Sequence, residues 1–411
     1  MQTVRANPYR WTVEAALLPL QFSMGLNFFG PSALFPLIMD SRHVDRGTVS
    51  LLMVAVMVVM TFLLIPAGVL VTRLGAKKAI ALAGLLIGLG ILGGTGPSFF
   101  FLIGLRIALG VGASMLFPAT STTLVQWFTP RELPLVNSFN MAAGGIGVAT
   151  AMFVGVPIAH HWGWEGVFFT YGAVTLLATL IWATLGKPAP RSHQVAAMPS
   201  LKTLLSMVRD RNTLVLAVAG MAPQVLFVAY NSWLPTYYHE VFGMPLERGT
   251  AIVAMIPIVG VVANIVGGLL MARIGLRKPF LLLTCVSFPV AAFGTFYVNN
   301  LAVISLSIIT LGIGSSLFLA ALFTVAMELP GIDTQRVGLV VAVVLTLGNV
   351  ATAFSPLAVG MSTDKLGSYL PSLIVLALLP LVTLAVGMFL PETGPRAAMR
   401  TAQRQPALPA N

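Results

Sequence analysis

Long apolar stretches run along almost the whole chain and are broken by short polar, charged or Gly/Pro-containing segments. A helix needs about 20 apolar residues to cross a bilayer, and the breaks define about twelve stretches of roughly that length. Because backbone in contact with lipid must satisfy its own hydrogen bonds, we predict an all-α integral membrane protein with about twelve transmembrane helices. The predicted spans are 12–39, 48–72, 79–96, 99–128, 134–159, 164–186, 213–239, 248–272, 279–297, 300–327, 337–361 and 369–390.

One hydrophilic break is much longer than the other internal ones, and it separates six predicted spans from six. This break is the segment 187–212, which contains three prolines. We therefore predict an N-terminal six-span half over 1–186, a central cytoplasmic loop over 187–212 and a C-terminal six-span half over 213–390. The segment 391–411 is rich in Pro, Ala and Arg, and we expect a disordered cytoplasmic tail there.

Short motifs of the first half recur in the second half at a constant offset of 202 residues. The matching segments are Asp45–Thr48 with Glu247–Thr250, Leu109–Ser114 with Leu311–Ser316, and Val148–Ala151 with Val350–Ala353. Two six-span halves in parallel topology are typical of secondary transporters, which bind their solute between the halves. The alternative is a duplicated membrane protein that transports nothing.

The composition supports a membrane protein and excludes several other classes. Of the 411 residues, 57% are hydrophobic and 9% are charged, whereas a soluble domain carries about 25% charged residues. A soluble enzyme, a nucleic-acid-binding protein and a disordered protein are therefore excluded. The single cysteine, Cys285, rules out an internal disulfide, and no nucleophile–base or metal-ligand pattern occurs. We expect neither enzymatic activity nor a cofactor nor a metal.

The net charge of +11 is explained by the orientation of the chain in the membrane. With a cytoplasmic N-terminus, 18 of the 23 Lys and Arg residues fall on the cytoplasmic side and Arg106 falls inside a span. Only Arg42, Arg46, Arg248 and Lys365 fall on the outer side. The positive-inside rule then places both termini in the cytoplasm. The positive charge is therefore no indication of a nucleic-acid partner.

The segment Gly68–Lys78 resembles the loop signature that the major facilitator superfamily carries between its second and third spans, and Gly268–Lys278 is a weaker copy of it. The resemblance covers essentially the whole chain, because the span number, repeat, central loop and orientation also fit. It implies a carrier of the bacterial inner membrane whose two halves rock about a cavity lined mainly by spans 1, 4, 7 and 10. The signature residues, to which we assign a conformational role, are Gly68, Arg73, Gly75, Lys77, Lys78, Gly268, Arg273, Gly275, Arg277 and Lys278.

The chain also departs from the family pattern. Thr72 and Ala272 stand where the family usually has an acid before the loop arginine, so the interlock attributed to that acid lacks its residue here. The segments Trp233–Tyr237 and Leu390–Gly394 are similar to those of cyanate-permease-like and other anion-transporting members.

Arg106 is the one basic residue within a predicted span, about 10 Å below the outer end of its helix. A charge in hydrocarbon costs several kcal/mol, so its side chain should face a cavity or a partner. Its counterpart in the repeat is Ile308, so the fold does not require a charge in both halves. Two interpretations stay open: an anion ligand or coupling residue, since guanidinium binds carboxylate bidentately, or a structural arginine that binds neighbouring carbonyls.

Acidic side chains are absent from the predicted middle of the membrane. Glu14, near the cytoplasmic end of the first span, is the only candidate for coupling to protons, and the alternative is an interfacial acid at a helix start. Asp45 and Glu247 each open a helix at the outer face, where an acid favours the positive helix end.

Other polar and aromatic side chains within the spans are candidates for solute contact. An aromatic stripe of span 7 contains Tyr230 and Trp233, with Asn231 beside it, and forms either a cavity wall or an interfacial aromatic belt. Asn140 and Asn264 lie in stripes of small residues, where asparagine bonds across close helices or contacts solute. The residues that we predict to bind the solute are Arg106, Asn27, Tyr230, Asn231, Trp233 and Asn349.

Together these features predict a secondary transporter that moves a small organic or inorganic anion across the inner membrane by alternating access. An exporter of amphipathic drugs, using the aromatic face and the 19 methionines, is one alternative. A membrane sensor that binds without transporting is another. The expected partners are a small anionic solute and membrane lipid, without nucleic acid, and the expected state is a monomer.

Overall fold

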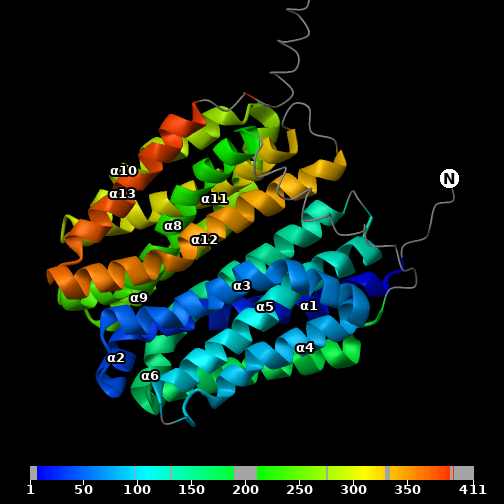
Figure 1. The fold of residues 1–411 in the computed structure, drawn as a ribbon, viewed down its shortest axis with the longest axis horizontal. Coiled ribbons are helices and arrows are strands. Elements are labelled where there is room, and N and C mark those ends of the chain that lie inside the picture. The colour runs from blue at the N-terminus through cyan, green and yellow to red at the C-terminus, as the bar shows by residue number, and fades with distance from the viewer. Residues whose placement is uncertain are drawn as a thin grey trace, which may run out of the picture. The chain divides into compact units, whose positions relative to one another are not determined.

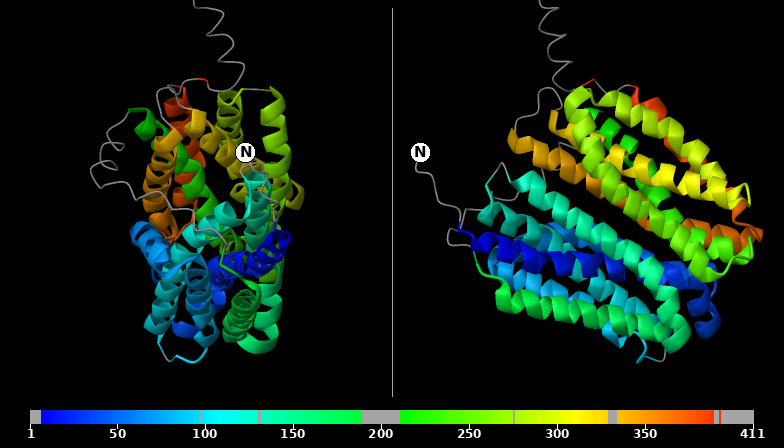
Figure 2. Two further views of the ribbon diagram at one scale, coloured as in Figure 1. Left: turned by 90° about the vertical axis from the view of Figure 1, so that its right-hand side faces the viewer. Right: turned by 180° about the vertical axis from the view of Figure 1, so that it is seen from behind.

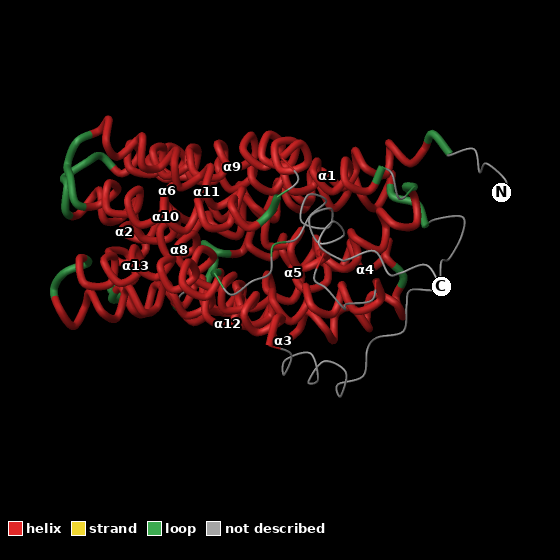
Figure 3. The backbone as a smooth tube through the Cα atoms, turned by 90° about the horizontal axis from the view of Figure 1, so that it is seen from above, coloured by secondary structure: helices red, strands yellow, loops and turns green. Residues whose placement is uncertain are grey.

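The structure is a computed structural model, and it describes residues 7–96, 98–129, 132–188, 211–274, 276–328, 334–388 and 392. Within these ranges the chain forms helices joined by short loops, with no strand (Figure 3). Most of the predicted central loop lies outside the described residues, and so does the predicted tail apart from Glu392. The all-α membrane architecture expected from the hydropathy pattern is confirmed.

The helices of the first half follow the predicted spans, with three local differences (Figure 1). They are α1 (Tyr9–Phe29), η1 (Gly30–Leu34), α2 (Phe35–Arg42), α3 (Arg46–Leu74), α4 (Ala76–Gly88), η2 (Leu89–Leu92), α5 (Phe99–Trp127) and α6 (Leu133–Leu185). The first span is interrupted by the 3₁₀ turn η1, and the third loses regular α-helix in a glycine-rich run after Gly88. The fifth and sixth spans both lie within α6, which changes direction at Trp162 and Gly163, where the φ/ψ angles are not helical.

The helices of the second half are α8 (Arg211–Glu240), α9 (Leu246–Ile274), α10 (Lys278–Phe296), α11 (Leu301–Glu328), α12 (Thr334–Leu366) and α13 (Leu370–Gly387). Each predicted span of this half lies on one of them. Among the described residues, nine segments are long and apolar enough to cross a membrane, and the whole of α6 counts as one of these.

By its internal contacts the chain divides into two compact units. The first unit contains Met1–Met198, Val228–Val261 and Ala353–Tyr369, and the second contains Pro199–Phe227, Val262–Thr352 and Leu370–Asn411. In the first unit α1 packs against α6, α3 against α5, and α4 against both α5 and α6 (Figure 2). In the second unit α10 packs against α11 and α13. The predicted boundaries of the two halves, the loop and the tail stay a prediction.

A close crossing of α1 and α6 fixes the position of both helices in the first unit. A Cβ atom at Gly25 would overlap the carbonyl oxygen of Gly144, and one at Gly147 would overlap the carbonyl oxygen of Phe22. Only glycine permits this approach, and the helices then share a buried core that includes Leu17 of α1 and Trp182 of α6. The crossing brings polar residues of α1 within reach of α6.

Candidate functional site

The guanidinium of Arg106 ties α5 to α1 and α3. Its Nε donates to the carbonyl of Leu52 at 2.7 Å, its Nη1 to that of Asn27 at 2.7 Å and its Nη2 to that of Phe28 at 2.8 Å. A further contact of Nη2 with Met53 Sδ, at 3.7 Å, completes the set. With 2% of its surface exposed, Arg106 is buried, and most of its donors are used within the protein.

The sequence of α1 explains why two of these carbonyls need a donor. The last carbonyls of a helix lack intrahelical partners, and α1 ends at Phe29. Pro31 carries no N–H, so the carbonyl of Asn27, four residues earlier, cannot accept the usual helical hydrogen bond. Arg106 supplies the missing donor at a helix C-terminus, where a positive charge is also favoured by the helix dipole.

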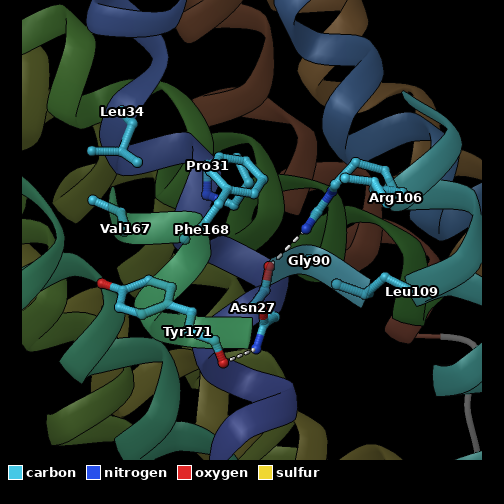
Figure 4. A pocket seen from close by; sticks show the side chains of 11 residues that line it. Asn27, Pro31, Leu34, Gly90, Arg106, Leu109, Val167, Phe168 and Tyr171 are labelled. Atoms are coloured by element: carbon cyan, nitrogen blue, oxygen red, sulfur yellow. Dashed lines mark hydrogen bonds between the residues drawn. The ribbon is translucent and has the colours of Figure 1, made fainter. Parts of the chain in front are cut away.

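The side-chain amide of Asn27 is also engaged within the first unit. Its Nδ2 donates to the Ser23 carbonyl at 2.9 Å, the Thr175 hydroxyl at 2.8 Å and the Tyr171 carbonyl at 3.3 Å. Asn27 and Arg106 thus lie together, as Figure 4 shows, and both contribute to the contacts between α1 and its neighbours.

A small cavity lies beside Arg106 and Asn27. The centre of a water molecule can occupy a volume of about 20 Å³ within it. This space suits roughly one water and is too small for an organic solute. Most of its wall is apolar (Figure 4). The lining residues are Asn27, Gly30, Pro31, Leu34, Gly90, Leu105, Arg106, Leu109, Val167, Phe168 and Tyr171.

The charge of Arg106 is not neutralised by any carboxylate among the described residues. All four of its contacts are carbonyl oxygens or a thioether, and it makes no ion pair there. Glu14, the acid on α1, precedes Asn27 by 13 residues, or about 20 Å along the helix. The guanidinium is therefore buried without a counter-ion among the described residues.

The predicted solute residues of α8 are fully buried in the first unit. The indole N–H of Trp233 donates to the Pro356 carbonyl of α12 at 2.8 Å, and its ring packs against Phe35 and Tyr369. Tyr230 and Asn231 precede it on the same helix and have no exposed surface. Asn349 is half-buried on the part of α12 that belongs to the second unit.

Glu14 is buried within the protein, with 2% of its surface exposed. Its Oε1 accepts a hydrogen bond of 2.7 Å from the side-chain amide of Asn140 on α6. Asn140 therefore bonds across two closely packed helices, as its stripe of small residues suggested.

The first loop signature forms the connection between α3 and α4. Gly75 has φ +81°, a left-handed conformation that favours glycine, and its N–H bonds to the Val71 carbonyl at 2.9 Å. Gly68 is half-buried and Lys77 is too, while Arg73 and Lys78 are exposed. None of the three cations makes an ion pair with a described residue, which agrees with Thr72 in place of an acid.

The second loop signature binds the start of the predicted tail. Glu392 Oε1 accepts from the backbone N–H of Arg277 at 2.8 Å and of Lys278 at 3.3 Å, where α10 begins. Lys278 Nζ in turn donates to the Met388 carbonyl at 2.6 Å. Of the other signature residues, Gly268 and Arg273 lie on α9, whereas Gly275 lies outside the described residues.

The structure also contains a cluster of charged side chains, at the start of α3 and the ends of α8 and α12, that was not among the predicted site residues. Arg46 Nη2 contacts Glu240 Oε2 at 2.7 Å, its Nη1 contacts Asp364 Oδ1 at 3.5 Å, and its Nε donates to the Tyr369 hydroxyl at 2.8 Å. The Tyr369 hydroxyl donates to Glu240 at 2.9 Å, and burial raises the pKa of this tyrosine. In the sequence, Arg46 stood out only because it recurs as Arg248 in the second half, and this recurrence does not indicate its partners.

Comparison with known proteins agrees with this architecture. The family model described as Major Facilitator Superfamily matches residues 17–356. A protein named as a probable sulfoacetate transporter of Cupriavidus necator is 26% identical, with 77% of this chain and 79% of that protein covered. The 4-hydroxybenzoate transporter of Pseudomonas aeruginosa is 24% identical over 66% of this chain and 68% of its own length.

A nitrite extrusion protein of Bacillus subtilis is 26% identical over 50% of this chain and 52% of that protein. Among solved structures, a bacterial homolog of the human lysosomal transporter Spinster has the same fold, with a TM-score of 0.72 and 15% sequence identity. The match covers 93% of this chain and 95% of that one. The chain is therefore a multi-pass membrane transporter of small solutes rather than an enzyme, and it belongs to the Major Facilitator Superfamily.

Proposed function

We propose that this transporter carries a small organic or inorganic anion across the bacterial inner membrane by alternating access. The observation that carries the proposal is the buried, unneutralised charge of Arg106. Its hydrogen bonds to carbonyl groups hold the guanidinium in place but leave its charge in force. An anion is the solute that compensates such a charge.

The size of this attraction is large enough to select the sign of the solute. At an effective dielectric constant of about 20, a monovalent anion about 6 Å from the guanidinium gains about 3 kcal/mol, roughly a hundredfold in affinity. A cation at the same place is disfavoured by a similar amount. Because the adjacent cavity holds about one water, we infer that Arg106 acts through its field rather than as a bidentate ligand.

The relatives support an anionic solute. The names of three of them specify sulfoacetate, 4-hydroxybenzoate and nitrite, all of which are anions at neutral pH. The distribution of Lys and Arg supports cytoplasmic termini. We assign the remaining contacts with the solute to Asn27, Tyr230, Asn231, Trp233 and Asn349.

The test is counterflow in proteoliposomes with radiolabelled sulfoacetate, 4-hydroxybenzoate and nitrite, each beside a neutral amide or alcohol of similar size where one exists. We expect at least one anion to exchange and its neutral analogue not to. The variant Arg106→Gln should lose this exchange, whereas Arg42→Gln should keep it. Arg42 is a suitable control because it also binds a carbonyl, that of Gly96 at 3.1 Å, but at the outer end of α2.

Exchange that is unchanged in Arg106→Gln contradicts the anion assignment. Exchange of an amphipathic cation in place of any anion favours the drug exporter. Saturable binding without flux, measured on the same liposomes, favours a sensor.

A further inference from the structure

Two buried hydroxyl groups on α8 have no hydrogen-bond partner. Ser232 Oγ and Thr236 Oγ1 belong to side chains without exposed surface, and neither atom bonds to any group in the described part of the chain. Buried polar atoms without a partner are rare in native structures, and each case calls for a physical explanation. Neither residue was among the predicted solute ligands.

Buried hydroxyls on α5 show the usual behaviour of such groups within a helix. Ser114 and Thr123 each donate to the carbonyl four residues earlier, at 2.7 and 2.8 Å. This bond is open to any serine or threonine in a helix interior. Ser232 and Thr236 do not make it, so both hydroxyls are available to another partner.

The two hydroxyls lie on one face of α8. Ser232 and Thr236 are four residues apart, so their side chains are neighbours on the helix surface. Trp233, about 100° further round the helix, packs against α2. Tyr238, whose hydroxyl also lacks a described partner, lies on a different side, beside Gly249 of α9. The hydroxyl pair therefore lies between the sides of α8 that meet α2 and α9.

The hydroxyl pair lies at a depth in the first unit similar to that of Arg106. The start of α5 and the end of α8 are at the same end of this unit, because Arg42 binds a carbonyl just before α5 and Arg46 binds the last residue of α8. Along the helices, Arg106 is about 10 Å from the start of α5 and Ser232 is about 12 Å from the end of α8. A solute that reaches the hydroxyls is therefore at the depth of the buried charge.

The chemistry of the pair complements that of Arg106. A hydroxyl donates to an oxygen atom, and the bond is stronger when this oxygen carries negative charge. Two such donors one turn apart can bind two oxygens of one small group, but they carry no charge that would select its sign. Because neither side chain has exposed surface, a solute can reach them only after α8 has moved relative to its neighbours.

We propose that the hydroxyls of Ser232 and Thr236 donate hydrogen bonds to the oxygen atoms of the solute and make the carrier select an oxyanion group, such as a carboxylate, a sulfonate or nitrite. This inference rests on the proposed anion transport. Arg106 then determines the sign of the solute, and the hydroxyl pair determines the shape of its charged group. The described conformation, in which both hydroxyls lack a partner, is the one without solute at this place.

The test is thermal unfolding in lipid nanodiscs, without solute and with sulfoacetate, 4-hydroxybenzoate or nitrite. Without solute, Thr236→Val should raise the Tm by roughly 2–4 °C, because valine has the shape of threonine but no unpaired hydroxyl. For the anion that stabilises the wild type, Thr236→Val and Ser232→Ala should each weaken binding about tenfold, and the double variant about a hundredfold.

Matched controls are Thr123→Val and Ser114→Ala, which remove buried hydroxyls that already have a partner. Neither control should raise the Tm of the solute-free protein, and both should bind the anion as the wild type does. The opposite signs expected for Thr236→Val, a more stable protein with weaker binding, are not produced by a residue that serves the structure alone.

An anion that stabilises the wild type and the double variant equally overturns the hydroxyl contact and leaves the proposed anion transport standing. A solute-free Thr236→Val protein that is less stable than Thr123→Val overturns it too, because the hydroxyl would then have a structural partner. If a neutral amide or alcohol of similar size stabilises the wild type in place of every anion, and the double variant loses this effect, the hydroxyl site is supported and only the proposed anion transport fails.

Discussion

Replacing Arg106 by lysine and by methionine separates the two roles that its contacts imply. Arginine presents its donors on a planar fork that reaches carbonyls of two helices at once, whereas lysine presents donors from a single nitrogen. Arg106→Lys therefore keeps the charge and loses part of the hydrogen bonding. Arg106→Met loses both and leaves the carbonyls of Asn27 and Phe28 without a donor at the end of α1.

The expected destabilisation follows from three N–H···O contacts of 2.7–2.8 Å. Hydrogen bonds with a charged donor contribute about 1.5–3 kcal/mol each, so their loss costs roughly 4.5–9 kcal/mol. Removing the buried charge returns several kcal/mol of desolvation energy. We expect a net loss of about 2–4 kcal/mol in Arg106→Met, which lowers the Tm of a six-helix half by roughly 5–15 °C. Arg106→Lys should lose about 2 kcal/mol.

The assay combines thermal unfolding in lipid nanodiscs, followed by tryptophan fluorescence at one fixed scan rate, with the affinity for the transported anion. Arg106→Lys should keep the affinity within about tenfold, and Arg106→Met should lose roughly a hundredfold. A methionine variant as stable as the wild type would refute the capping role at α1. If the lysine variant loses as much affinity as the methionine variant, geometry rather than charge governs binding.

Two further predictions concern the start of α3. Arg46→Met should weaken the contact of α3 with α8 by about 1 kcal/mol, because the bond to Glu240 is partly exposed, and this makes amide exchange at both helix ends roughly fivefold faster. Amide hydrogen exchange that mass spectrometry finds unchanged at these helix ends would contradict this prediction. Asp45 caps α3, accepting from Thr48 N–H at 2.6 Å, and this bonding lowers the pKa of Asp45. Its ionised form therefore stabilises the fold above the unfolded pKa of about 3.9, and the effect is lost as pH falls through the lower folded pKa. Asp45→Ala should be less stable than the wild type by about 1 kcal/mol at pH 6, which thermal unfolding reports as a lower Tm. The difference in Tm between the two proteins should shrink below about pH 4, and a difference that does not depend on pH would contradict this prediction.

The helices were predictable from the sequence because membrane burial imposes a length and an apolar composition on every span. The capping of α3 by Asp45 followed from residue type and position alone. The shortness of the turn inside α6 did not, because a break in hydropathy marks a change of direction equally well for a long loop and for the two-residue turn at Trp162 and Gly163.

The contacts of the candidate site were only partly accessible to sequence reasoning. Pro31 marks the carbonyl of Asn27 as one without a helical donor, but nothing in α1 indicates which side chain supplies it. The partners of Arg46 lie about 200 residues or more away along the chain, so only the fold brings them together. A buried acid such as Glu14 is visible in the sequence, but its lack of a counter-charge is a property of its surroundings.

Arg106 and Glu14 are both buried on contacts of α1, about 20 Å apart along that helix, and neither has a counter-ion among the described residues. At an effective dielectric constant of about 20, the attraction between opposite charges at these two places is below about 1 kcal/mol, so Glu14 cannot compensate the charge of Arg106. A bound anion compensates it locally. On the function proposed above, the loaded carrier is therefore the state with less uncompensated buried charge at Arg106, and it is the state better suited to pass through a closed, apolar intermediate.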